Sequence, residues 1–154
     1  MFKSEIKTEG LKEVEDFLKG VNDRFIDPSY ELKNTSNYIE STVFPKRFND
    51  EKNPTGGRWK PSKRVVLHGG KTLTDTRALR NSMRANPQVL GSGKIDISMF
   101  AEGEPAKYAA VHNNGLRIKN RSGRLTKMPK RQFAWISQKE KEIILYDIFL
   151  RGLE

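Results

Sequence analysis

Residues 116–128 read Leu-Arg-Ile-Lys-Asn-Arg-Ser-Gly-Arg-Leu-Thr-Lys-Met, and this stretch decides the fold that we expect. Apolar and polar side chains alternate on both sides of Asn120-Arg121-Ser122-Gly123, four residues that are typical of a turn. The pattern predicts a β-hairpin. Its apolar side chains are expected to face the core: Leu116, Ile118 and Leu125, with Met128 as a further candidate. Its cations would then share the opposite face and form a one-sided basic ribbon: Arg117, Lys119, Arg124 and Lys127.

The charge of the whole chain is concentrated around this hairpin. The 154 residues carry 29 Lys+Arg and 19 Asp+Glu, a formal net charge of +10. Residues 61–136 contain fifteen of the cations and only four carboxylates, so the excess lies in the middle of the chain. Such a cluster is either a solvated loop or a surface for an anionic partner. The residues that we select as candidates to face DNA or another anion are Arg117, Lys119, Arg121, Arg124 and Lys127.

Upstream of the hairpin, apolar residues three and four positions apart predict a helix over about 10–22. A second helix is expected to begin at Asp27-Pro28 and to end or kink near Phe44, because Pro45 follows. Residues 49–63 are polar and rich in turn residues, so we expect a loop whose Trp59 is pinned to the core.

The remaining patterns predict short elements. A brief strand is expected at 64–67, then a short helix after Thr74-Asp75-Thr76 with Leu79 and Met83 buried, and a half-buried strand at 95–100. Residues 108–115 predict a helix stopped by Gly115 in a left-handed conformation. Ser137 to Glu140 form a capping box that opens a largely apolar last helix, which suits packing against a sheet, a neighbouring subunit, or both. The fold class that we expect is α+β in one domain, 1–154: N-terminal helices, a small antiparallel sheet with a long basic hairpin, and a C-terminal helix packed on the sheet.

The sequence offers no constellation that specifies a reaction. It has no Cys, which excludes disulfides, thiol nucleophiles and Cys-based metal sites. Its two His residues are forty-four positions apart, and although His112-Asn113-Asn114 resembles the start of an HNH nuclease motif, no second metal-binding His follows it. There is no GxSxG motif and no P-loop. We therefore expect a non-enzyme without a cofactor. No membrane span or secretion signal is apparent, so we expect a soluble protein made in a cytoplasm.

Four motifs, taken in order, resemble the phage virion morphogenesis, or tail-completion, family of tailed bacteriophages. The resemblance covers about residues 40–153. The motifs are a Pro/Gly loop ending in Trp (54–59), Leu-x-x-Thr-Gly-x-Leu-x-x-Ser (73–82), Tyr-Ala-x-x-His-x-x-Gly (108–115) and Pro-x-Arg-x-Phe (129–133). The matching residues that we expect to have structural roles are Trp59, Thr76, Leu79, Ser82, Tyr108, Ala109, His112, Gly115, Arg131 and Phe133.

The chain departs from the family pattern at two positions. Arg77 stands where the family usually has Gly, so we expect no positive φ there. Gln132 stands where a Pro is frequent, so we expect that turn to be less rigid. The resemblance implies a non-enzymatic virion protein that is assembled in the cytoplasm of a bacterial host and acts in tail completion or head–tail joining. It also implies a homo-oligomeric ring, commonly hexameric, around the DNA channel, with other tail or head-connector proteins as partners and no membrane.

The residues themselves suggest local roles. Tyr108 and Trp59 suit the pinning of loops, and His112 suits the capping or bridging of backbone groups. Arg131 is expected to brace the hairpin against the last helix through Glu142 or Asp147. The alternative function is a small nucleic-acid-binding protein that uses the 116–128 hairpin directly. Against it, no aromatic side chain lies between Leu116 and Gln132 to stack on bases.

Overall fold

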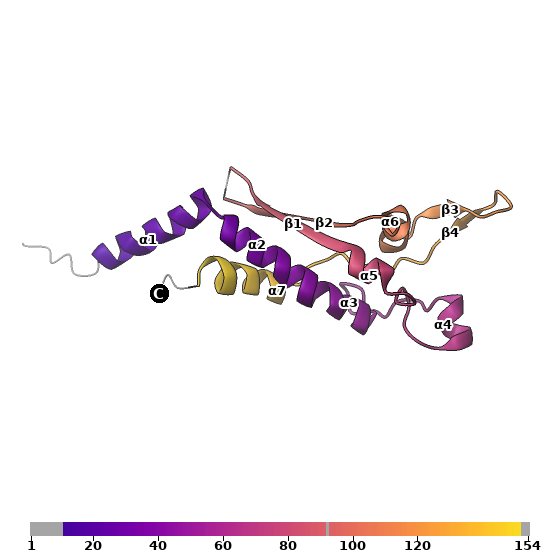
Figure 1. Ribbon diagram of the computed structural model, residues 1–154. Coiled ribbons are helices and arrows are strands. Elements are labelled where there is room, and N and C mark those ends of the chain that lie inside the picture. Colours follow the sequence, from indigo (N-terminus) through magenta and orange to yellow (C-terminus); the bar gives the residue numbers. More distant parts are fainter. Residues whose placement is uncertain (1–10, 92, 152–154) are drawn as a thin grey trace, which may run out of the picture.

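A long helical rod forms the spine of the molecule (Figure 1). The computed structural model describes residues 11–91 and 93–151. The first helix, α1 (Leu11–Ile26), leads at an angle into three segments that run on as the rod: α2 (Ser29–Tyr38), the π-helical segment η1 (Ile39–Val43) and α3 (Phe44–Asp50). One face of the rod is fully buried and begins the core: Thr35, Ile39, Val43, Phe44 and Phe48.

Pro45 does not end this rod, so that one of the two expected outcomes was wrong, but the winding of the helix changes just before it. It is the second residue of α3, and the turn before it is wound as a π-helix in which the N–H of Phe44 donates to the carbonyl of Ile39. Proline has no N–H to donate and its ring crowds the carbonyl four residues earlier. The wider π turn accommodates that ring, and the helix continues to Asp50.

The segment after the Trp59 loop is helical, although a strand was expected at 64–67. Helix α4 (Lys63–His68) begins at Ser62, whose side chain accepts a hydrogen bond from the N–H of Val65 at 3.3 Å. The apolar run of this segment suggested a strand, but its Val66 and Leu67 are exposed, and among residues 11–91 and 93–151 no strand lies beside it. The Ser62 cap decides the outcome locally.

A two-stranded antiparallel sheet covers the rod. Strand β1 (Met83–Val89) follows the short helix α5 (Ala78–Ser82) directly, and it pairs with β2 (Ile95–Ala101) from Met83↔Ala101 to Val89↔Ile95. Leu79 and Met83 are both buried as expected, but Met83 opens a strand instead of continuing the helix. The predicted strand at 95–100 is confirmed, and the mixed α+β class with it.

Two polar side chains of the rod attach the sheet. Ser36 donates to the carbonyl of Ala85 at 2.8 Å, and the carboxylate of Glu40 accepts from the N–H of the same residue at 3.0 Å. Both backbone groups of Ala85 are therefore satisfied by the rod, which fixes where β1 lies along it.

The chain then passes through α6 (Ala106–Asn114) and the hairpin of β3 (Arg117–Lys119) and β4 (Leu125–Lys127) to its C-terminal helix. That helix is α7 (Gln138–Glu142) followed by the π-helical η2 (Ile143–Phe149), and the predicted capping box at Ser137 and Glu140 is present in both directions. It lies along α2 and faces β2 across a groove, so its contact with the sheet is less direct than expected.

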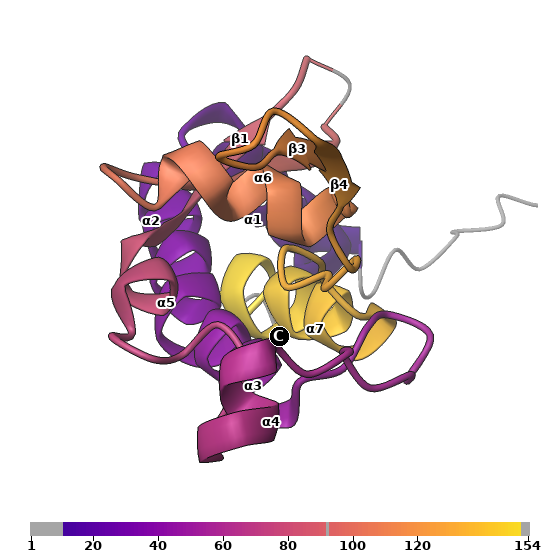
Figure 2. The same cartoon turned by 90° about the vertical axis from the view of Figure 1, so that its right-hand side faces the viewer.

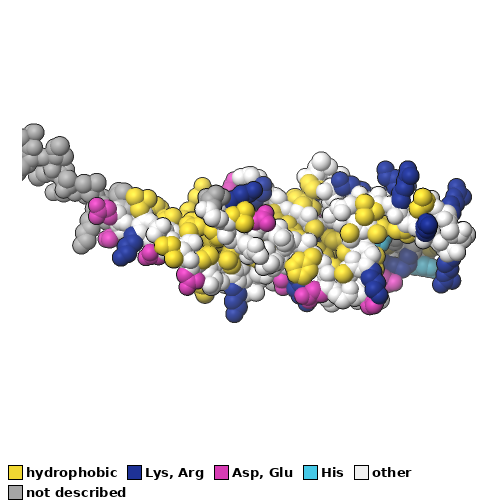
Figure 3. All heavy atoms as spheres, turned by 90° about the horizontal axis from the view of Figure 1, so that it is seen from above, with side chains coloured by type: hydrophobic (Ala, Val, Ile, Leu, Met, Phe, Trp, Pro, Cys, Tyr) yellow, Lys and Arg dark blue, Asp and Glu magenta, His cyan; other side chains and the backbone are white. Residues whose placement is uncertain are grey.

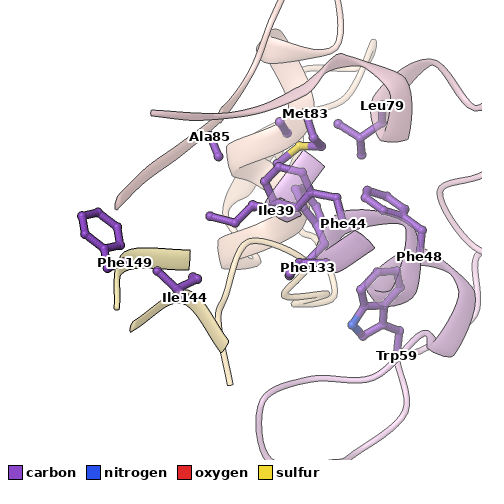
Figure 4. Close-up of a cluster of buried hydrophobic side chains, with 12 residues drawn as sticks. Ile39, Phe44, Phe48, Trp59, Leu79, Met83, Ala85, Phe133, Ile144 and Phe149 are labelled. Carbon is purple, nitrogen blue, oxygen red and sulfur yellow. The ribbon is translucent and has the colours of Figure 1, made fainter. Parts of the chain in front are cut away.

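The core is aromatic at the end nearest α3 (Figure 4). The ring of Phe48 stacks on that of Phe133 with centroids 5.2 Å apart, and Trp59 meets both rings edge-on. The indole N–H of Trp59 donates to the carbonyl of Gln132 at 3.2 Å. Trp59 therefore pins the 49–63 loop to the core, as predicted.

Candidate interaction site: the basic hairpin and the junction at its base

The stretch that opened the sequence analysis is a hairpin, and its turn is built by one side chain. The carboxamide oxygen of Asn120 accepts from the N–H of Ser122, the hydroxyl of Ser122 and the N–H of Arg124, at 3.1, 2.7 and 2.9 Å. Gly123 takes a positive φ of 77°. An Asn that closes a turn on its own backbone in this way fixes the length of the loop and hence the register of the strands.

The register corrects the predicted division of the hairpin into two faces. Arg117 pairs with Lys127, Ile118 with Thr126, and Lys119 with Leu125. Directly opposed residues of an antiparallel pair point to the same side. Leu125 therefore lies on the face of Lys119, and Arg124 lies on the other face. Cations and apolar side chains are mixed on both faces instead of being separated.

The apolar side chains of the hairpin do not reach the core. Leu116, Ile118 and Leu125 are 45%, 36% and 57% exposed, and only Met128 is half-buried. The hairpin projects beyond the end of the sheet, where no second layer covers it (Figure 1). Its five candidate cations are all exposed: Arg117, Lys119, Arg121, Arg124 and Lys127. No ion pair that the structure describes involves any of them.

Two acid-free segments form this end of the molecule, which we call the basic end. Residues 52–74 hold six Lys or Arg and residues 105–139 hold nine, with no Asp or Glu in either, so the rest of the chain carries a net charge of −5. The hairpin and α4 project from this end on opposite sides (Figures 1 and 2). Dark blue side chains gather there in the space-filling view (Figure 3). Carboxylates border this end, because Asp75 lies 3.5 Å from Arg64 and Glu104 lies 2.7 Å from Lys107. The excess of cations still makes the molecule electrically polar along its length.

Removing the hairpin charges should leave the fold intact. We expect the replacement of Lys119, Arg121, Arg124 and Lys127 by Ser to change the free energy of unfolding by less than about 1 kcal/mol, because exposed unpaired charges contribute little each. Urea denaturation followed by circular dichroism measures it. A loss of several kcal/mol would mean that the hairpin is packed against the body.

Three of the family motifs meet at the base of the hairpin, in what we call the motif junction: Trp59, His112, Asn113, Arg131 and Phe133. Arg131 is buried there, and its Nε donates to the carbonyl of Lys60 at 2.8 Å. Its NH1 lies 3.3 Å from Nδ1 of His112, while its backbone N–H donates to the carbonyl of His112 at 2.8 Å. The predicted bridge from Arg131 to Glu142 or Asp147 is wrong. The predicted bridging role of His112 agrees with these contacts.

Two asparagines hold the backbone of the motif junction, and neither role was predicted from the sequence. The carboxamide oxygen of Asn113 accepts from the N–H groups of Phe133 and Ala134, both at 3.0 Å. That of Asn53 accepts from the N–H of Gln132 at 3.1 Å. A proline at position 132 has no N–H, so the departure from the family pattern supplies a hydrogen bond here. Asn is common in loops, and its partners lie 20 and 79 positions away, beyond any local pattern.

The other motif residues have packing or backbone roles. Ala109 and Phe133 are buried, and Gly115 ends α6 with φ 67° and ψ 45°, as predicted. Tyr108 does not pin a loop, because its ring is exposed and only meets the ring of His112 edge-on, with centroids 6.0 Å apart. Among the described residues, no apolar side chains cover the ring of Tyr108.

The Leu73–Ser82 motif forms a separate, local structure. Leu79 is buried, Ser82 donates to the carbonyl of Leu79 at 2.8 Å, and Thr76 accepts from the N–H of Ala78 at 3.3 Å. Arg77 has a φ of 59°, so the expectation that this position needs no positive φ was wrong. The backbone keeps the left-handed conformation for which glycine is suited, although Arg occupies the position.

The environment of His112 favours its neutral form. Burial lowers the pKa of His112 below its ordinary value of 6.5, and the Arg131 guanidinium lowers it further. Because arginine can only donate, Nδ1 of His112 accepts and the ring proton lies on Nε2. The neutral ring stabilises the folded state fully above pH 6.5, and this stability is lost as the pH falls through 6.5 towards the lower pKa of the folded protein.

We therefore expect the free energy of unfolding to fall between pH 7.5 and 5.5, and His112→Gln to remove most of that decline. Urea titrations at the two pH values measure it. The matched control is His68→Gln, since His68 is exposed in α4, and this variant should keep the decline. An unchanged decline in His112→Gln would contradict the assignment.

An ion pair that the sequence did not reveal anchors the C-terminal helix. Arg47 of α3 donates to the carboxylate of Glu140, and both side chains are buried. The guanidinium carbon of Arg47 lies 3.6 Å from the ring centroid of Trp135. Burial alone would raise the pKa of Glu140, but hydrogen bonds from Ser137 and the charge and hydrogen bond of Arg47 together hold it below its ordinary value. The two partners are 93 positions apart, so no spacing could have indicated them.

Within the described residues, no three His, Asp or Glu side chains are grouped so that they could hold a metal ion. No described helix is both long enough and apolar enough to cross a membrane. The cations of the hairpin are exposed, and the base of the hairpin is attached to the core by the hydrogen bonds of Arg131 and Asn113.

Comparison with known proteins gives one match. The model of the phage virion morphogenesis family matches residues 11–154, which is nearly the whole chain. No curated protein and no solved structure shows significant similarity. Because the match includes the loop, the motif junction and the hairpin, the chain belongs to the phage virion morphogenesis family, whose proteins serve in the structure or assembly of phage particles.

Proposed function

We propose that this protein is a non-enzymatic ring subunit of the virion, acting at the head-proximal end of the tail in tail completion and head–tail joining. It would be assembled in the cytoplasm of the bacterial host. The basic end would dock on an anionic surface of a neighbouring connector or tail protein. The observation that carries this proposal is the charge polarity of the molecule, with fifteen cations and no carboxylate in the two segments that form one end.

Apolar side chains at the same end favour a protein as the docking partner. Leu67, Leu116 and Leu125 are exposed beside the cations. Protein interfaces combine an apolar centre with a charged rim, whereas binding to phosphates needs only the charges. The motif junction supports the same function, because it ties the hairpin to the core through Arg131 and Asn113 and so holds the docking surface in a fixed orientation.

The proposal is tested by joining heads to tails in an extract. Cells infected by a phage that lacks this gene should accumulate unjoined heads and tails, and the purified protein should restore infective particles. We expect the variant with Ser at 119, 121, 124 and 127 to restore at least tenfold fewer plaques at equal concentration. A matched control is Lys33→Ser, at an exposed cation on α2 far from the basic end. Full activity of the hairpin variant would contradict the proposed docking surface.

The alternative function, direct DNA binding, is favoured by the five exposed hairpin cations, and it makes a quantitative prediction. If these cations neutralise about five phosphates, the logarithm of the binding constant should fall with the logarithm of salt concentration with a slope near −4.5. Fluorescence anisotropy with a labelled duplex between about 50 and 200 mM salt measures the slope. A flat or undetectable response would exclude direct contact with DNA and leave a protein as the partner.

A further inference from the structure

Helix α1 carries an apolar stripe that its own chain covers only at one end. At the last turn, the ring of Phe25 stacks on that of Phe149 with centroids 5.8 Å apart, and Arg24 donates to the carbonyl of Phe149 at 2.7 Å. One and two turns earlier the same stripe continues through Val21, Phe17 and Leu18. Phe17 and Leu18 are 42% and 58% exposed. The helix points away from the body there (Figure 1), so no described segment covers them.

The body, in turn, has an apolar groove that nothing in the described chain fills. It lies between β2 and the C-terminal helix and has a volume of about 460 Å³. Phe25 of the chain's own α1 belongs to its lining, which is otherwise mainly Ile95, Ile97, Met99, Ile136, Ile144 and Leu145. Leu145 at its edge is exposed. A space of this size would hold about fifteen waters, and apolar walls bind such water poorly.

The cations at the groove complement the charge of α1. Lys141 lines the groove, and Lys94 precedes the lining residue Ile95. The exposed charges of α1 over residues 15–23 are three carboxylates, Glu15, Asp16 and Asp23, and one lysine. A helix laid in the groove with its stripe inward would bring its acidic flanks near these two lysines.

We propose that the apolar stripe of α1 in one copy of this protein occupies the β2–η2 groove of a second copy. The same chain cannot fill its own groove, because Arg24 and Phe25 hold the last turn at Phe149 and the unbroken helix carries Phe17 outward. A contact between two different surfaces, repeated from copy to copy, closes a ring when the rotation permits it. The inference thus rests on the ring of the proposed function and specifies its subunit contact.

The absence of native Cys allows a direct test by cross-linking in the full chain. Phe17→Cys and Leu145→Cys variants are prepared separately, mixed at about 50 μM, oxidised mildly and separated on a non-reducing gel, with a mass tag on one of them. We expect a mixed disulfide between the two variants. The matched control replaces Phe17→Cys by Leu67→Cys, at an exposed apolar residue of α4, and should give at least tenfold less mixed product.

A second measurement uses Leu18→Glu, which places a charge on the stripe. We expect wild-type copies to associate in sedimentation velocity and this variant to associate at least about 30-fold more weakly, as for a residue at the centre of an interface. Predominant 17–17 disulfides, or a wild-type monomer without mixed disulfide, would each overturn the inference. If Leu18→Glu still joins heads to tails and the two Cys variants give no mixed disulfide, the contact between α1 and the groove is overturned while the proposed function stands. If the mixed disulfide forms strongly but the wild-type protein does not join heads to tails, the contact between α1 and the groove is supported and the proposed function is overturned.

Discussion

Glu140→Gln should lower the free energy of unfolding by about 3 kcal/mol, which corresponds to a fall in Tm of roughly 6–12 °C. Arg47 stays charged in the variant because its guanidinium cannot lose its proton, and it is buried with its Nε already without a hydrogen-bond partner. Glutamine preserves the capping box at Ser137, so the loss reports mainly on the charge. The amide oxygen has two lone pairs and can still accept from both Ser137 and Arg47, which places the effect at the low end for a broken buried pair.

Urea denaturation at pH 7 measures this effect, and Glu142→Gln is the control. Glu142 is exposed two positions further along the same helix, and its substitution should change the free energy of unfolding by less than about 0.5 kcal/mol. The difference between Glu140→Gln and the wild type should also depend on pH. Because folding lowers the pKa of Glu140, its stabilisation is present above the ordinary value of 4.5 and is lost as the pH falls below it. A loss under 1 kcal/mol at pH 7 would mean that the pair is not buried.

The second large effect is expected for Gly115→Ala, which should lower the free energy of unfolding by about 2–6 kcal/mol. Gly115 has a φ of 67°, where an L side chain is strained by about 1–3 kcal/mol. An added Cβ would also lie 2.9 Å from Cβ of Lys130 and 3.1 Å from its Cα and N. The backbone of Lys130 cannot move freely, because Arg131 beside it is held by Lys60 and His112. Overpacking of this kind typically adds about 1–3 kcal/mol.

Gly123→Ala separates the two contributions. Gly123 has a φ of 77° in the hairpin turn but open space where its Cβ would be, so only the backbone strain of about 1–3 kcal/mol applies. Thermal and urea unfolding of both variants measure the difference. Should Gly115→Ala prove no more damaging than Gly123→Ala, the close approach of Lys130 to α6 would be refuted.

The expectations that succeeded rest on interactions within a few residues. The capping box at Ser137, the left-handed end of α6 at Gly115 and the Asn120 turn each involve groups no more than four positions apart. Such contacts form in the same way wherever the segment lies in the fold. For the same reason the four family motifs could be recognised from residue spacing alone.

The failed expectations about the hairpin faces and Arg131 concern partners distant in sequence, whereas those about residues 64–67 and Arg77 failed for local reasons. Alternation predicted the hairpin, but which apolar residues are buried depends on a second layer, and the structure provides none above Leu116 and Leu125. Arg131 bonds Lys60 and His112, 71 and 19 positions away, in preference to a carboxylate of the last helix. Strand β1 was not predicted from the sequence. Ala85 attaches it to the rod through hydrogen bonds with Ser36 and Glu40, which lie 49 and 45 positions away.

The sequence by itself determined most of the local elements, the α+β class, the family and the concentration of positive charge between residues 61 and 136. Each of these follows from residue order, periodicity and counting. Only the tertiary structure decided that the two acid-free segments share one end, that Arg47 meets Glu140, and that an apolar stripe on α1 and an apolar groove beside β2 are both left open. Burial and charge pairing are properties of what surrounds a side chain in space, and a pattern along one chain does not specify those surroundings.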